Sequence, residues 1–246
     1  MSHSGLAELP EHELRRLEAV AGEDRPLEDL VERRLAGEPL QYIEGTAPFA
    51  HLDLVVDERV LVPRPETEGL FELAARMVDR PQVIVDLCTG SGALALALKS
   101  RFPGAEIYGT DTSGDALDVA RLNGKRTALE VTWIEGDLFD PLPESLRGTV
   151  DLIVANPPYV ADPEFETLPE DVKREPRVAL MSGPTGLEVV ERIGAEVADW
   201  LRPGGVVAIE ISEFQGETAP RLFAGVQVEV RRDLTGRDRY VVGVRS

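Results

Sequence analysis

The chain has 246 residues, of which 26 are lysine or arginine and 45 are aspartate or glutamate, giving a formal net charge of −19. This length suits one large domain with a small appendage, and the acidic surplus disfavours a nucleic-acid partner, because duplex binding draws on clustered basic residues. The single cysteine, Cys88, excludes an internal disulfide, and three histidines leave no Cys/His cluster with metal-ligand spacing.

The N-terminal quarter of the chain predicts helices followed by a hairpin. Residues 1–20 lack the apolar core of a signal peptide, and no later run has membrane-spanning length, so we expect a cytoplasmic protein without a membrane partner. Leucine and valine at helical spacing predict short amphipathic helices over Glu11–Val20 and Pro26–Leu35. Apolar residues between Phe49 and Val62 predict a β-hairpin that turns near Asp57.

From residue 65 onward, helix and strand patterns alternate, which indicates an α/β fold with a parallel sheet covered on both faces. Helices are expected over Glu66–Val78, Ala93–Ser100, Gly114–Asn123 and Gly186–Leu201. Strands are expected over Val83–Leu87, Glu106–Thr110, Val131–Ile134, Val150–Ala155 and Val206–Ile211, with a closing hairpin of Val226–Arg231 and Arg239–Val244. We therefore expect a helical cap (residues 1–45), a hairpin linker (46–64) and a Rossmann-like main domain (65–246) with a mostly parallel, seven-stranded sheet.

A glycine turn follows the first strand of this domain and opens a helix. Its residues run Asp86-Leu87-Cys88-Thr89-Gly90-Ser91-Gly92, and glycines here let a ligand press against the backbone. The same turn also satisfies a loose dinucleotide fingerprint, so NAD is a rival ligand. Asp86 favours S-adenosylmethionine, because a carboxylate attracts its sulfonium and ammonium groups and repels a pyrophosphate.

Two further aspartates follow the next strands of the domain. Asp111 ends the second strand, where a carboxylate can accept from both ribose hydroxyls, in NAD as in S-adenosylmethionine; its alternative role is to cap the helix near Ser113. Asp137 follows the third strand and is placed to accept from an adenine amino group, with Leu138 or Phe139 packing on the ring. A solvated turn is the alternative for Asp137.

The tetrad Asn156-Pro157-Pro158-Tyr159 follows the buried strand Val150–Ala155. Asn-Pro and Pro-Pro are ordinary turn signals, but open α/β sheets bind ligands beyond the carboxyl ends of their strands, where this tetrad lies. The amide oxygen of Asn156 and the carbonyl of Pro157 can accept both hydrogens of an NH2 group. With Tyr159 packed against a planar amide, the tetrad predicts methyl transfer onto nitrogen.

These motifs, in this order, resemble the class I S-adenosylmethionine-dependent methyltransferases that modify exocyclic or amide nitrogen. Further segments narrow the resemblance to the HemK/PrmC family, the release factor glutamine methyltransferases, from Gly37 to the C-terminus. They are Gly37–Gly45, Pro63–Glu68, Glu175–Leu180 and Asp233–Asp238. Three departures stand out: Cys88 replaces a more usual glycine, Leu138 occupies an often aromatic place, and the helical cap is short.

The resemblance implies methylation of the glutamine side chain in the Gly-Gly-Gln loop of peptide chain release factors, without a metal. It implies catalytic roles for Asn156, Pro157 and Tyr159, and substrate binding by these with Pro158. It implies cofactor binding by Asp86, Cys88, Thr89, Gly90, Ser91, Gly92, Asp111, Asp137, Leu138 and Asn156. The alternatives are a nucleic-acid amino methyltransferase, a nicotinamide oxidoreductase that leaves the tetrad unexplained, and a cofactor-binding regulator without turnover.

Overall fold

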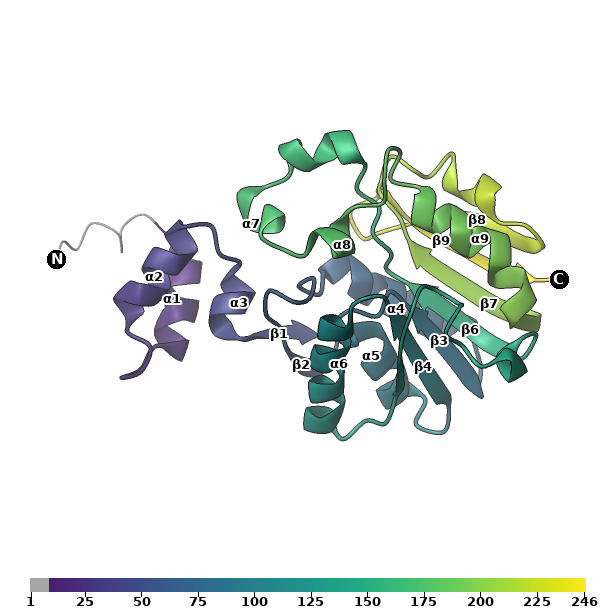
Figure 1. The fold of residues 1–246 in the computed structure, drawn as a ribbon, viewed down its shortest axis with the longest axis horizontal. Helices are drawn as coiled ribbons and strands as arrows, with labels where there is room; N and C mark the ends of the chain where they lie inside the picture. Colours follow the sequence, from purple (N-terminus) through teal and green to yellow (C-terminus); the bar gives the residue numbers. More distant parts are fainter. Residues whose placement is uncertain (1–8) are drawn as a thin grey trace.

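A computed structural model of the chain describes residues 9–246 and contains a seven-stranded sheet of order β5-β4-β3-β6-β7-β9-β8 (Figure 1). Residues 1–8, which include His3 and the start of the predicted cap, lie outside the described residues. The first five strands of this order are parallel, and β9 is antiparallel to both β7 and β8. The strands are β3 (Val83–Leu87), β4 (Glu106–Asp111), β5 (Thr132–Glu135), β6 (Val150–Ala155), β7 (Leu201–Glu210), β8 (Val226–Arg232) and β9 (Asp238–Arg245).

Helices cover both faces of the sheet, because alternate residues of its buried strands point to opposite sides. Ile84 and Leu152 face a cluster that contains α4 (Pro65–Met77) and α5 (Ala93–Arg101), whereas Val85 and Ile153 face α9 (Glu188–Trp200). The residues Ala93 to Leu98 of α5 are apolar all round and all buried, as expected of a helix enclosed by protein. The predicted Rossmann-like α/β fold is confirmed, with element ends shifted by a few residues.

The N-terminal helices form a small cluster beside the sheet domain (Figure 1). They are α1 (Glu11–Val20), α2 (Leu27–Leu35) and α3 (Leu40–Glu44), of which α3 was not predicted. Leu17, Leu30 and Ile43 are buried at their centre. Arg16 pairs with Glu44 and Arg34 pairs with Glu13, so ion pairs join the helices around this core.

The predicted hairpin exists, but its predicted turn is wrong. The strands are β1 (Thr46–Phe49) and β2 (Leu52–Val55), so the chain turns at Ala50, which has a left-handed φ of 52°. Val60 and Val62 are buried without a strand partner; they pack with Tyr42 and with α6 (Gly114–Thr127). Burial against a helix, and not strand pairing, explains their apolar character.

The carboxyl ends of four neighbouring strands meet at one edge of the sheet. Leu87 of β3 pairs with Thr110 of β4 and with Ala155 of β6, and Ala155 pairs in turn with Ile209 of β7. This register brings the glycine turn, Asp111, the tetrad and Glu210 to the same edge. The segment with α7 (Glu170–Lys173) and α8 (Arg177–Leu180) lies near this edge and contacts the N-terminal helices through Arg174 and the carbonyl of Ala36.

Candidate active site

A cavity of about 280 Å³ lies beyond the carboxyl ends of β3, β4 and β6. Its walls include most of the residues that the sequence predicted to bind a cofactor. They are Asp86, Cys88, Thr89, Gly90, Ser91, Asp111, Asp137, Leu138 and Asn156. Gly92 is not in the wall: a Cβ there would lie 2.7 Å from Trp133, so close packing and its left-handed φ of 82° explain this glycine.

Asp86 is a buried carboxyl group in the wall of this cavity. Its side chain is 1% exposed, and its Oδ2 accepts from Thr89 Oγ1 at 2.5 Å and from the backbone N–H of Ala95 at 3.1 Å. Its Oδ1 is buried without a hydrogen-bond partner among the described residues. Burial raises the Asp86 pKa to about 7. A positive ligand group would satisfy Oδ1 and favour the ionised carboxylate.

Asp111 connects the glycine turn to the start of α6. Its Oδ2 accepts from the N–H of Gly90 and its Oδ1 from the N–H of Ser113, both at 2.9 Å. Ser113 itself caps α6 by accepting from Ala116. Burial raises the Asp111 pKa, and each carboxylate oxygen keeps a further lone pair. Asp111 therefore structures the turn and can still accept hydrogen bonds from a ribose diol.

The far end of the cavity contains a residue that the sequence did not indicate. Arg192 of α9 donates to Asp137 Oδ2 at 2.8 Å and lines the cavity beside it. Leu138 has a left-handed φ of 48°, and its carbonyl accepts from Thr110 Oγ1 at 2.9 Å. No local pattern marks Arg192, because it lies 55 positions beyond Asp137 in an amphipathic helix.

Cys88 occupies the turn in a conformation that favours glycine. Its φ is 55°, which agrees with the resemblance in which a glycine is more usual at this position. Burial raises the pKa of its thiol, so the neutral thiol is the prevailing form at neutral pH. Cys88 therefore contributes a neutral thiol to the cavity wall.

The tetrad lies beside the cavity with two acceptors free. Asn156 and Pro158 line the cavity; Pro157 and Tyr159 do not. Asn156 Nδ2 donates to Thr67 Oγ1 at 3.0 Å, and Tyr159 donates its hydroxyl to Glu210 Oε1 at 3.2 Å. Neither Asn156 Oδ1 nor the Pro157 carbonyl accepts a hydrogen bond from any residue in the range 9–246. This pair can accept from an incoming NH2 group.

The segment that follows the tetrad closes one side of the cavity. Val178, Ala179 and Met181 line it, and Met181 forms a β-bridge with Val160. Glu175 is buried; its Oε1 pairs with Arg64 and its Oε2 accepts from the N–H of Val62 at 3.1 Å. Arg64 therefore anchors this segment to the linker.

The described residues contain neither a metal-binding cluster nor a membrane-spanning helix. Within residues 9–246, no group of three or more histidine, cysteine, aspartate or glutamate residues is arranged to hold a metal ion. In the same range, every helix is too short or too polar to cross a bilayer.

Known proteins that resemble this chain are methyltransferases. Residues 70–183 match the family model of the methyltransferase small domain. The chain is 43% identical over 223 residues to a release factor glutamine methyltransferase of Deinococcus radiodurans, covering 89% of this chain and 78% of the relative. It is 44% identical over 224 residues to one of Mycolicibacterium smegmatis, covering 89% and 79%.

Solved structures that resemble the chain agree with its fold. A methyltransferase from Pyrococcus furiosus aligns with a TM-score of 0.57 and 20% identity, covering 79% of this chain and 89% of that one. A 16S rRNA N2 G1207 methyltransferase of T. thermophilus, solved with AdoMet and guanosine, aligns with a TM-score of 0.58 and 21% identity over 82% of this chain and 50% of that one. At these identities the likeness concerns the fold alone.

Proposed function

Because the chain belongs to the family of release factor glutamine methyltransferases, we propose that it methylates peptide chain release factors on the glutamine of their Gly-Gly-Gln motif. The methyl group comes from S-adenosylmethionine and is transferred to the side-chain amide nitrogen. The observation that carries the proposal is the free acceptor pair of Asn156 and Pro157 next to a cavity whose wall contains the unpartnered Asp86 oxygen.

The residues of the cavity fit the cofactor in charge and in hydrogen-bonding capacity. Asp86 Oδ1 offers a buried acceptor for the ammonium group of the methionine moiety, and Asp111 offers acceptors for the ribose. Gly90 keeps the wall open, since a Cβ there would meet no atom within 4 Å. Asp137 and Leu138 are assigned to the adenine. S-adenosylmethionine supplies an electrophilic methyl group on a sulfonium, and S-adenosylhomocysteine is the other product.

The tetrad would position a nitrogen that is by itself a poor nucleophile. Its lone pair is delocalised into the neighbouring carbonyl, so orientation must supply much of the rate enhancement, and well-oriented reactions gain roughly 7–11 kcal/mol in this way. Asn156 Oδ1 and the Pro157 carbonyl would accept the two amide hydrogens, and Tyr159 would pack against the amide plane. As the nitrogen forms its bond to the methyl carbon, the bond from that carbon to sulfur would break and leave a neutral thioether. The N-methylated amide would then be a cation whose N–H groups are strongly acidic, and it would lose one proton to water. This step needs no metal and no separate base.

We assign the protein substrate to the surface near α7, α8 and the N-terminal helices. Arg34 Nη2 lies 3.6 Å from Asp171 Oδ2, and Arg174 Nη2 donates to the Ala36 carbonyl at 2.7 Å. The segment around α7 and the N-terminal helices are therefore in contact. A release factor approaching the tetrad would meet both. The partner is a component of translation, which agrees with a cytoplasmic protein.

Peptide mass spectrometry tests this function. The protein is incubated with S-adenosylmethionine carrying a labelled methyl group, with purified release factors, and with release factor variants whose loop glutamine is replaced by alanine. We expect label on that glutamine in the unmodified factors and none in the variants. Label on another residue, or on RNA added to the same mixture, would overturn the proposal.

A further inference from the structure

A buried glutamate, Glu210, is connected to the tetrad through two hydrogen bonds. Glu210 ends β7 and is 0% exposed. Its Oε2 accepts from Thr67 Oγ1 at 2.7 Å, and Thr67 Oγ1 lies 3.0 Å from the side-chain nitrogen of Asn156. Thr67 lies in the first turn of α4 and is also buried. Residues from α4, from β7 and from the turn after β6 thus form one chain of hydrogen bonds that ends at the tetrad.

When Glu210 is ionised, the chemistry of this chain fixes the direction of every hydrogen in it. An ionised carboxylate can only accept, so the single hydroxyl hydrogen of Thr67 is directed at Glu210. Thr67 then presents only lone pairs to Asn156, and the Asn156 atom that faces it must be the NH2 group. A flipped amide would place one oxygen against another. Orientation of an asparagine amide follows from its hydrogen-bond network in this way.

From this polarity we propose that Glu210, acting through Thr67, determines which end of the Asn156 amide faces the substrate nitrogen. The inference rests on the function proposed above and assigns Glu210 and Thr67 as positioning residues for it. With the NH2 group held by Thr67, the Asn156 Oδ1 is the end left to accept from the substrate amide. A reversed Asn156 would present two hydrogens to the two hydrogens of the glutamine amide and could not hold it.

The same carboxylate also holds the aromatic residue of the tetrad. Glu210 Oε1 accepts from the Tyr159 hydroxyl at 3.2 Å, so its two oxygens serve two different tetrad residues. The backbone around Tyr159 is held separately, because Gln215 Nε2 donates to the Tyr159 carbonyl at 3.2 Å. One buried group therefore couples the position of Asn156 to that of Tyr159.

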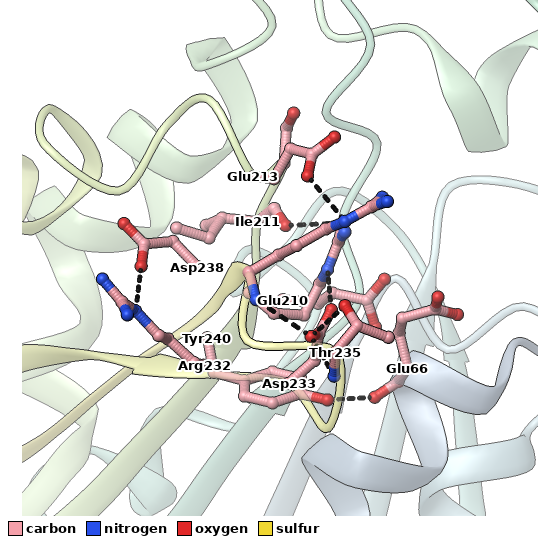
Figure 2. Close-up of polar contacts among 12 residues, drawn as sticks. Glu66, Glu210, Ile211, Glu213, Arg232, Asp233, Thr235, Asp238 and Tyr240 are labelled. Atoms are coloured by element: carbon pink, nitrogen blue, oxygen red, sulfur yellow. Dashed lines mark hydrogen bonds and ion pairs between the residues drawn. The ribbon is translucent and has the colours of Figure 1, made fainter.

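The hairpin between β8 and β9 supplies the positive charge that favours the ionised form of Glu210. Arg239 is 11% exposed in its side chain; its Nε lies 3.4 Å from Asp233 Oδ2, and its Nη1 donates to the Ile211 carbonyl at 3.3 Å. Asp233 in turn accepts from the backbone and hydroxyl of Thr235 at 2.8 and 2.6 Å. Figure 2 shows Glu210 beside this turn. Burial raises the Glu210 pKa to about 7, against lowering by the Thr67 hydrogen bond and the Arg239 charge.

The position of Thr67 itself is fixed from the same side of the sheet. The Tyr240 hydroxyl of β9 donates to the Glu66 carbonyl at 2.7 Å (Figure 2), so the first turn of α4 is tied to the strand that carries Arg239. A Cβ on Gly69 would lie 2.2 Å from the Tyr240 hydroxyl oxygen, so glycine at this position allows α4 to lie close to β9. Residues 63–68 and 233–238, which are distant from the tetrad in sequence, thus both contribute to the orientation of Asn156.

Three variants test the inference: Thr67→Val, Thr67→Ser and the control Thr127→Val. Valine keeps the shape of threonine and removes the hydroxyl, serine keeps the hydroxyl, and Thr127 uses its hydroxyl only within α6, bonding the Asn123 carbonyl at 2.8 Å. A misplaced reacting group costs on the order of 10²-fold in rate, so we expect kcat of Thr67→Val to fall by about that factor. The dissociation constant of S-adenosylmethionine and the KM for the release factor should stay near those of the unmodified protein, whereas Tm should fall modestly because Glu210 loses a buried hydrogen-bond donor. Thr67→Ser should recover most of the turnover.

The outcomes separate this inference from the proposed function. If the unmodified protein fails to label the glutamine, the proposed function itself is wrong. If it labels the glutamine and Thr67→Val turns over as fast as Thr127→Val, the role of Thr67 and Glu210 is wrong while the function stands. If Thr67→Val fails to fold, Glu210→Met decides, because methionine has a similar length and offers Thr67 no oxygen acceptor, which removes the polarity. Its kcat should fall with Tm retained, and an unchanged kcat would overturn the inference.

Discussion

The two most deeply buried carboxylates at the carboxyl edge of the sheet, Asp86 and Glu210, differ in one respect that separates binding from positioning. Both are almost inaccessible to solvent, and burial raises the pKa of each to about 7. Both oxygens of Glu210 accept hydrogen bonds from side chains, whereas Asp86 has one oxygen without a partner among the described residues. A buried acceptor that lacks a partner and lies in a cavity wall can be completed by a ligand, and one that has its partners holds other groups in place.

Asp86 and Glu210 also differ in the charged groups that surround them. Among residues 9–246, Asp86 accepts hydrogen bonds only from the neutral groups of Thr89 and Ala95, so a cationic ligand could complete it. Around Glu210 the protein supplies its own cation, Arg239, whose charge lowers the Glu210 pKa. The groups around each carboxylate therefore determine whether it is available to a ligand or holds other side chains.

The largest loss of activity is expected from a change in the tetrad, which Glu210 holds in place. Asn156→Ala removes one of two acceptors for the substrate amide, and loss of a single transition-state hydrogen-bonding group costs roughly 10²–10³-fold in turnover. We expect a loss at the upper end, with cofactor affinity nearly intact. Single-turnover methylation and calorimetry measure the two quantities, and a variant with most of its activity would refute the tetrad assignment.

The next largest effect is expected at Asp86. Opposite charges about 4 Å apart near a protein surface attract by roughly 4 kcal/mol before desolvation, so Asp86→Asn should weaken S-adenosylmethionine binding by about 10²-fold after that cost. Turnover at saturating cofactor should change little, in contrast to Asn156→Ala. A calorimetric affinity equal to that of the unmodified protein would show that the unpartnered oxygen of Asp86 does not face the cation.

Replacement of Asp111 should weaken S-adenosylmethionine binding less than replacement of Asp86. Asp111→Ala removes acceptors for a ribose diol, and hydrogen bonds to a charged group contribute about 1.5–3 kcal/mol, so a loss of roughly tenfold or more in cofactor affinity is expected. Part of this loss comes from the turn, because Gly90 and Ser113 lose their acceptor as well. Asp111→Asn keeps an acceptor and should lose less. Unchanged affinity of the alanine variant would mean that the ribose lies elsewhere.

The smallest effect is a pH dependence of cofactor binding. The Asp86 pKa is raised to about 7, so the ionised form that attracts a cation increases as the pH rises toward and through that value. Affinity should increase about fivefold between pH 6 and pH 7, following the ionised fraction. The cofactor-free protein should show the opposite trend in stability: Asp86 binds its proton more tightly folded than unfolded, so its contribution is lost as the pH rises through about 7. Calorimetry across this range, with Asp86→Asn as a flat control, measures the dependence.

The residues at the carboxyl edge of the sheet could be predicted from the sequence, whereas the hydrogen bond between Thr67 and Glu210 could not. Asp86 and Asp111 lie at the ends of their strands and Asn156 directly follows one, so local periodicity was enough to bring them together. Thr67 and Glu210 are 143 positions apart and belong to a helix start and a strand end that look ordinary by themselves. Only the register of β6 with β7 and the packing of α4 bring them into contact, and neither can be read from a local pattern.

The misplaced hairpin turn has a similar cause. Val60 and Val62 have the character of strand residues, yet they are buried against α6 and Tyr42. Ala50, where the chain does turn, carries no turn signal of its own, because alanine rarely adopts a left-handed φ. Arg192 escaped prediction because its contact with Asp137 joins α9 to a turn far earlier in the chain.

The most direct test of the central claim is a crystal structure with S-adenosylhomocysteine and a peptide that contains Gly-Gly-Gln. We expect the glutamine NH2 group to donate one hydrogen to Asn156 Oδ1 and the other to the Pro157 carbonyl, with Asn156 Nδ2 still bonded to Thr67. The ammonium group of the cofactor product should lie at Asp86 Oδ1. A glutamine amide bound away from Asn156, or an Asn156 whose oxygen faces Thr67, would contradict the account.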